Sequence, residues 1–256
     1  MPLPVQAPEP APLLRSTTAA TVPPKPSFDC PIQQQSRPWN APGQPIEAGS
    51  SPKKVETPAT PGLEAPGDLA VGADYRQRLK ITPAGWPVRS QWCVWVEPLE
   101  AGTEAGTQVG PYGARWQRAV EAALTTWQAE LPIQRVATAE QAQVRLWRRK
   151  PPLESGPDGA SRASHGRALL ELRQVQRLGQ WQLEPQVEVL ISPGQRPEAI
   201  QATSLHELGH AFGLWGHSNQ GGDVMAASPT AKPVLALSAR DRATLRWLLR
   251  QPGLAP

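Results

Sequence analysis

The sequence predicts an α+β domain that follows a proline-rich region, and three observations support this. Sixteen of the 31 prolines fall before residue 71, and a segment so poor in apolar side chains and backbone donors favours neither helix nor sheet. Nine of the ten tryptophans lie after residue 75. The later part also mixes short runs at the strand period with segments at the helix period. We therefore expect residues 1–75 to be disordered and residues 76–256 to form one domain.

The first half of this domain predicts one helix and three strands. Residues 90–97 alternate and are rich in Trp and Val, which is typical of a strand. Residues 111–130 begin at a proline and repeat apolar side chains at spacings of three and four, which predicts an amphipathic helix. Two short alternating runs follow, residues 133–136 and 142–147, and we expect both to be strands.

A stretch rich in glycine, proline and serine, residues 151–166, predicts an irregular loop before two further strands. Those strands are expected over residues 167–175 and 187–191. The polar segment around Gly179 indicates a turn between them, which is compatible with an antiparallel pairing.

Two helices are expected at the end of the chain. The first begins at Pro197 and runs to about residue 214, because proline suits the first helical turn and Glu198 lies near the positive end of the helix dipole. The second covers residues 238–250, with Ser238 as its N-cap and leucines on its apolar face.

Three of the four histidines lie in one short stretch, HELGHAFGLWGH, from His206 to His217. Residues four apart on a helix share a face, with Cβ atoms roughly 6 Å apart, so His206 and His210 can direct ring nitrogens at one ion. A catalytic zinc site uses three protein ligands and keeps a position for water. Gly213 can adopt a positive φ, end the helix and turn the chain so that His217 becomes the third ligand.

Glu207 is the expected catalytic base. It is rotated by about 100° around the helix from His206, so its carboxylate can lie beside a metal-bound water instead of on the metal. Zinc lowers the pKa of such a water toward neutrality, and Glu207 can accept its proton and return it to the leaving nitrogen. This arrangement predicts the hydrolysis of amide bonds.

The motif resembles the zinc-binding stretch of the metzincin peptidases, and most closely that of the matrixins. The resemblance covers roughly residues 85–250 and includes GDVM, residues 222–225, which is similar to the family's Met-turn. It implies a zincin-like fold with a mixed, twisted five-stranded sheet, a long helix, an active-site helix and a C-terminal helix. It also implies that Met225 packs beneath the metal.

The loop to the third histidine is one residue longer than in the family. Three residues, 214–216, stand between Gly213 and His217, where the family has two. A turn can absorb one extra residue at little cost in closure entropy. Asp223 and His165 are the alternatives to His217 as third ligand.

The resemblance also assigns substrate and ion contacts. The family's edge strand binds the substrate backbone in antiparallel fashion, and the matching residues here are Arg167, Ala168, Leu169 and Leu170. The segment after Met225 would form the wall of the pocket for the side chain that follows the cleaved bond. The family often binds structural Ca²⁺ besides Zn²⁺, but no loop here fits a specific calcium site.

The two cysteines, Cys30 and Cys93, are too few for a disulfide framework, and they fall in the tail and in the core. In some matrixins a propeptide cysteine covers the zinc. The sequence around Cys30, FDCP, does not match that switch sequence, and we expect Cys30 to be a tail cysteine without a function.

Charge and composition narrow the classes of partner. The densest basic run, RLWRRK at residues 145–150, is more typical of a solvated strand edge than of a nucleic-acid site. No apolar segment is long enough to predict a membrane span, and no secretory signal is visible, although the resemblance implies an exported enzyme. We expect a monomer that acts on proteins or peptides and does not bind nucleic acid.

These observations predict a zinc-dependent endopeptidase. One alternative is a noncatalytic zinc-binding domain used for partner recognition, against which the presence of Glu207 argues. Another is that the proline-rich tail docks a partner through a polyproline helix and that the domain is accessory to this interaction.

Overall fold

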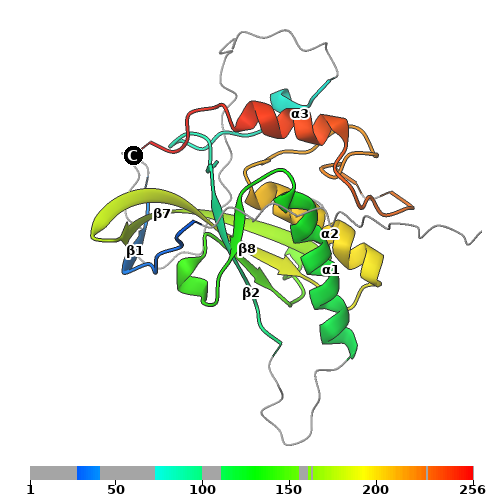
Figure 1. Ribbon diagram of the computed structural model, residues 1–256. Coiled ribbons are helices and arrows are strands. Elements are labelled where there is room, and N and C mark those ends of the chain that lie inside the picture. The colour runs from blue at the N-terminus through cyan, green and yellow to red at the C-terminus, as the bar shows by residue number, and fades with distance from the viewer. Residues whose placement is uncertain are drawn as a thin grey trace, which may run out of the picture.

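Figure 1 shows the fold in a computed structural model, which describes residues 28–40, 73–99, 111–155, 161–162, 164–228 and 230–255. These described residues form an α+β architecture with one mixed six-stranded sheet, a separate two-stranded pair and three α-helices. Helices α1 (Pro111–Gln128) and α2 (Pro197–Ala211) pack against each other, and α2 also packs on strands β7 (Gly166–Arg177) and β8 (Gln180–Ile191). None of the helices in these described ranges is long and apolar enough to cross a membrane.

The sheet combines a parallel half with an antiparallel half. Its strands, in spatial order, are β1 (Gln35–Pro38), β7 (Gly166–Arg177), β8 (Gln180–Ile191), β4 (Val144–Trp147), β2 (Trp92–Val96) and β3 (Ile133–Arg135). Strands β8, β4, β2 and β3 pair in parallel, whereas β7 is antiparallel to both of its neighbours. A separate antiparallel pair, β5 (Glu154–Ser155) and β6 (Ser161–Arg162), lies within the stretch that was expected to be irregular.

The three predicted helices are present with slightly different ends. They are α1 (Pro111–Gln128), α2 (Pro197–Ala211) and α3 (Ala239–Leu248), and single 3-10 turns occupy Arg76–Arg78 and Ala139–Gln141. Helix α2 has its proline at the first turn and ends before Gly213, whose φ of 108° is incompatible with a continuing helix. Ser238 is the N-cap of α3, as predicted, and it forms a reciprocal capping box with Asp241.

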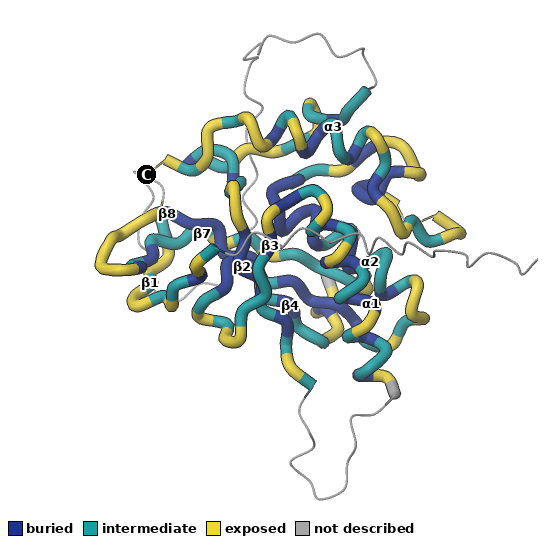
Figure 2. Tube along the Cα trace, viewed as in Figure 1, coloured by how far each residue is buried: buried dark blue, intermediate teal, exposed yellow. Residues whose placement is uncertain are grey.

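Large aromatic side chains tie α1 to the sheet and to α2. Trp116 and Trp127 are fully buried, and each indole N–H donates to a backbone carbonyl, that of Ile191 at 3.1 Å and that of Leu205 at 3.0 Å. Trp127 also packs edge-on against Phe212 just beyond α2. Burial therefore leaves neither indole N–H without a hydrogen-bond acceptor. Figure 2 shows a band of buried chain through the centre of the molecule.

The turn expected at Gly179 joins β7 and β8 in a tight antiparallel hairpin. Leu178 and Gly179 both have positive φ, at 50° and 79°, and their neighbours Arg177 and Gln180 are paired. A two-residue turn with this backbone matches the natural twist of a hairpin. Strand β8 begins well before the expected position because residues 180–186 are mostly polar, including the buried Glu184 and Gln186, and so lack the apolar pattern used to detect strands.

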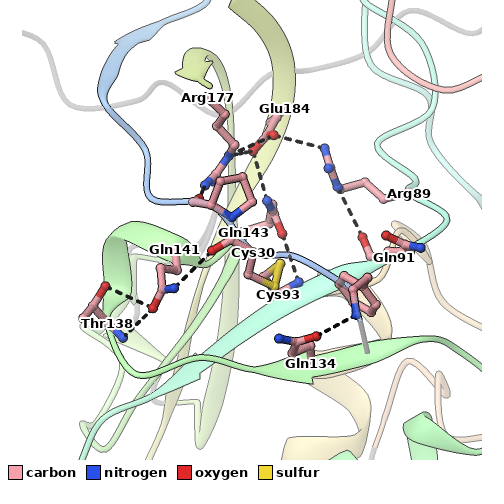
Figure 3. Close-up of a disulfide and its surroundings, with 12 residues drawn as sticks. Cys30, Arg89, Gln91, Cys93, Gln134, Thr138, Gln141, Gln143, Arg177 and Glu184 are labelled. Atoms are coloured by element: carbon pink, nitrogen blue, oxygen red, sulfur yellow. Dashed lines mark hydrogen bonds and ion pairs between the residues drawn. A yellow bond between two sulfur atoms is a disulfide. The ribbon is translucent and has the colours of Figure 1, made fainter. Parts of the chain in front are cut away.

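The expectation of disorder is wrong for residues 28–40, and so is the view that Cys30 is an unused tail cysteine. Cys30 forms a disulfide with Cys93 in β2, across 63 positions of sequence (Figure 3). After it, β1 pairs antiparallel with β7, which makes the sheet six-stranded where five strands were expected. An edge strand needs backbone pairing on one side only, so a polar, proline-containing segment can form one. Residues 1–27 and 41–72 lie outside the described part.

A buried charge cluster lies next to the disulfide, as Figure 3 shows. Glu184 is 2% exposed and accepts hydrogen bonds from Arg177 at 3.1 Å and from Gln143 at 3.2 Å, with Arg89 at 3.5 Å. Arg177 also donates to the carbonyl of Pro31. The cluster therefore ties the N-terminal segment to the sheet, and it supplies the partners that a buried carboxylate requires.

Candidate metal centre

Three histidines converge where α2 ends. His206 and His210 lie one turn apart on α2, and His217 approaches from the loop that follows. Their potential ligand atoms all lie within 4.8 Å of one another, and their ring centroids are 4.8–5.2 Å apart. In the part of the chain that the structure describes, neither Asp223 nor His165 joins this group. The structure thus brings together the three histidines that the motif predicted.

The two helical histidines are held with one ring nitrogen already engaged. His206 Nδ1 lies 2.8 Å from the carbonyl oxygen of Val224, and His210 Nδ1 lies 2.8 Å from that of Leu214. A carbonyl can only accept, so each Nδ1 carries the proton in the neutral imidazole, and Nε2 keeps its lone pair. Backbone partners of this kind orient metal-binding histidines and fix their tautomer.

The surroundings keep the imidazoles neutral. Burial lowers the pKa of all three histidines, most strongly that of His210, which falls to about 3. The neighbouring histidines lower the pKa of His210 further, and Lys80 contributes to the lowered pKa of His217. Metal ions bind the unprotonated ring. Three neutral imidazoles without a carboxylate form a donor set that suits zinc and leaves its fourth position open.

The loop between Gly213 and His217 is held by close packing. Gly213 turns the chain with a φ of 108°, after which Leu214 is fully buried and places its carbonyl on His210. The Trp215 ring stacks on the His210 ring, with centroids 5.4 Å apart and planes at 20°. The Trp215 carbonyl also accepts the backbone N–H of Lys80 at 2.7 Å. This loop is thus fixed on both sides.

Gly216 is required by a close approach of two backbones. A Cβ at this position would lie 2.1 Å from the carbonyl oxygen of Arg78 and 3.0 Å from the Cα of Leu79. Because neither contact involves a side chain that could move away, only glycine fits without a backbone shift. This contact sets the position from which His217 reaches the other two histidines.

Met225 packs against the helix that carries two of the histidines. It is fully buried, and its sulfur lies so close to Gly209 that a Cβ there would be 2.2 Å away. The backbone of the Met-turn, residues 222–225, is held by Asp241 of α3, which accepts the Val224 N–H at 2.9 Å. The fully buried Asp241 also accepts the hydroxyl of Tyr75 at 2.8 Å. Since Val224 binds His206, α3 indirectly supports the first histidine.

The Glu207 carboxylate lies against the beginning of β7. A Cβ on Gly166 would be 2.8 Å from Glu207 Oε1, and the backbone N–H of Ala168 donates to the carboxylate. Burial raises the pKa of Glu207 to about 7, although the Ala168 hydrogen bond and the charge of Arg167 oppose this shift. The group can therefore accept or donate a proton near neutral pH.

The residues expected to bind substrate, Arg167 to Leu170, lie in β7 beside Glu207, and the Leu169 side chain is 46% exposed. Sequence reasoning missed the neighbour of this strand. Strand β1 pairs with the outer half of β7, and the Trp39 N–H donates to the Leu172 carbonyl at 2.9 Å. Along residues 166–171 of β7, the described part of the chain places no strand on the side opposite β8.

Sequence reasoning also missed what Asp241 and Tyr75 do. Asp241 lies in the first turn of α3, and nothing in the sequence indicated its bond to the Met-turn. Tyr75 lies 166 positions away from Asp241, at the end of the region expected to be disordered, so no local pattern links the two.

Comparison with models of known protein families and with curated proteins finds no match. The chemistry of this site is therefore inferred from the side chains themselves.

Proposed function

We propose that the protein is a zinc-dependent endopeptidase of the matrixin-like metzincin type. The observation that carries this proposal is the convergence of three neutral imidazoles next to a buried carboxylate, beside a sheet edge that can bind extended peptide. His206, His210 and His217 would hold the zinc ion. Its Lewis acidity would polarise the scissile carbonyl and lower the pKa of the attacking water.

The protein supplies the proton transfers through Glu207. Its carboxylate accepts the proton of the attacking water and delivers it to the nitrogen that leaves. A pKa of about 7 suits both steps, because a group whose pKa lies near the working pH can accept a proton and release it again at little cost in free energy. The Ala168 N–H holds the carboxylate toward β7, which keeps it on the side from which a paired peptide would approach.

Strand β7 supplies backbone groups for substrate binding. An extended peptide that pairs with residues 166–171 would use main-chain hydrogen bonds for affinity and alternate side chains for selectivity. This mode requires no particular residue around the cleaved bond. It supports proteins or unstructured peptides as the substrate class.

The mechanism is tested by replacing Glu207 with glutamine. The Glu207→Gln chain should bind zinc with wild-type stoichiometry and lose about 10²- to 10⁴-fold in cleavage of a quenched protein substrate, the range usual for loss of a general base. Glu198→Gln is the matched control, because it makes the same change at an exposed position in the first turn of the same helix. Wild-type cleavage by the Glu207→Gln chain would refute the assigned role.

The same assay separates the enzyme from a noncatalytic zinc-binding domain. An enzyme should show cleavage that a chelator abolishes and added zinc restores. If the zinc-loaded wild-type chain cleaves no protein or peptide substrate, the noncatalytic alternative is correct.

A further inference from the structure

Strand β1 occupies part of the sheet edge on which substrate would bind. Gln35 to Pro38 pair antiparallel with Gln176 to Arg173, and the Trp39 N–H extends the contact to the Leu172 carbonyl at 2.9 Å. In Figure 1, β1 lies beside the end of β7 that is farther from α2. Among the described residues, β1 therefore lies along the outer half of the β7 edge, and no strand lies along the inner half, residues 166–171.

The inner half begins at the candidate site and is short. Glu207 lies against Gly166 and Ala168 at the inner end. From Ala168 the strand runs four residues to Leu172, where Trp39 is bound. At about 3.4 Å per residue, this distance is about 14 Å along the strand.

The polarity of β1 defines which side of a substrate meets this obstacle. β1 shows that this edge accepts an antiparallel strand, the pairing that is also the more stable per residue. A peptide bound in the same sense runs toward Gly166, with its amino-terminal end nearest Leu172. The residues before the cleaved bond would thus extend from Glu207 toward Trp39, and two chains cannot use the same backbone groups of β7.

Strand β1 is anchored firmly enough to act as a fixed obstacle. The Cys30–Cys93 disulfide lies five residues before its first residue. Side chains add to the backbone pairing, since Arg37 donates to the Gln174 side chain at 2.7 Å and Arg173 donates to the Ser36 hydroxyl. Displacing β1 would break these contacts together.

We infer that β1 is the amino-side boundary of the substrate cleft and that it limits pairing with β7 to about four residues before the cleaved bond. This inference rests on the proposed function. It predicts that a peptide gains affinity from each added amino-side residue only until it reaches Trp39. The Cys30–Cys93 disulfide then acts as the anchor of a device for substrate selection.

The test uses full-length zinc-loaded protein and peptides that share one cleavable bond but carry from about two to about eight residues before it. Binding is measured with the Glu207→Gln chain by fluorescence anisotropy, and cleavage is measured with the wild type. Affinity should rise by about threefold to tenfold for each added backbone hydrogen bond and level off at about four residues.

A proline variant removes the boundary. Arg37→Pro with Trp39→Pro deletes backbone donors, including the one bonded to Leu172. The matched control, Arg37→Ala with Trp39→Ala, loses the same side chains and keeps the donors. In the proline variant affinity should keep rising up to about eight residues, whereas in the alanine variant it should level off as in the wild type.

Several results would overturn the boundary: affinity that rises past four residues without a plateau in the wild type, or a plateau that persists in the proline variant. If that variant does not fold, as judged by its melting curve and zinc content, Cys30→Ser with Cys93→Ser replaces it, and an unchanged plateau again overturns the inference. Peptides that bind with the predicted plateau but are never cleaved would refute the peptidase and leave the boundary standing. Peptides that are cleaved but show no plateau in affinity would refute the boundary and leave the peptidase standing.

Discussion

Replacing Gly216 with alanine should weaken zinc binding, although this residue is not a ligand. The new Cβ would lie 2.1 Å from the Arg78 carbonyl oxygen, which is roughly 1 Å inside ordinary contact, and the neighbouring backbone cannot rotate out of the way. The strain is relieved most directly by moving the loop, and with it His217, by a similar distance.

A shift of this size matters because a zinc–imidazole bond is about 2.0–2.1 Å long and tolerates a deviation of only about 0.2 Å. We expect zinc affinity to fall by at least the 10- to 100-fold that is usual when the support of a ligand is disturbed. Overpacking should also lower the free energy of unfolding of the metal-free chain by about 1–3 kcal/mol.

The assay is competition for zinc with a chromogenic chelator, combined with urea unfolding of the metal-free chain. Gly222→Ala is the matched control, because this glycine lies beyond His217 in the Met-turn and a Cβ there would meet nothing within 4 Å. If Gly216→Ala binds zinc as tightly as Gly222→Ala does, the packing of this loop does not position the third histidine.

Three further predictions concern Asp241, the disulfide and the pH dependence of stability. Asp241→Asn should lower the free energy of unfolding by about 1–3 kcal/mol and weaken zinc binding, because Asn keeps one acceptor oxygen where the two carboxylate oxygens of Asp241 accept from Tyr75 and from the Met-turn N–H. Chemical unfolding and chelator competition measure the two effects. Cys30→Ser with Cys93→Ser should cost about 4 kcal/mol in chemical unfolding, as expected for a 63-residue separation, and leave zinc stoichiometry unchanged; retained stability would contradict the disulfide. In metal-free protein, the lowered pKa of His210 means that the unfolded chain binds more protons below about pH 6.5, so stability should fall as pH decreases. The raised pKa of Glu207 has the opposite effect between pH 4.5 and about 7, where it makes the folded chain more stable as pH falls. Unfolding curves should therefore show that Glu207→Gln loses stability more steeply than the wild type as pH is lowered through this range.

The histidine cluster could be predicted because the relationship of its members is local. His206 and His210 are one helical turn apart, and Gly213 marks the end of that turn with a backbone conformation that few other residues adopt. For His217, the sequence predicted only that the chain turns back after Gly213, and not where the side chain lies. Its position depends on Gly216 meeting the backbone of Arg78, a contact across more than a hundred residues that no spacing rule contains.

The N-terminal segment was misjudged for a physical reason. Periodicity detects strands that bury one face, whereas β1 lies at the edge and buries little. Its stability comes from the Cys30–Cys93 disulfide and from hydrogen bonds to β7, all of which join residues far apart in sequence. The sequence also could not predict that β1 pairs with the outer half of β7, because that pairing depends on the same N-terminal segment.

The most direct test of the central claim is the zinc content of the purified chain, measured together with chelator-reversible cleavage of a quenched protein substrate for wild type and for His217→Ala. We predict one zinc ion per wild-type chain, with cleavage that returns when zinc is restored, and the loss of both in the variant. A His217→Ala chain that keeps stoichiometric zinc and activity would show that the third ligand lies elsewhere and would contradict the proposed centre.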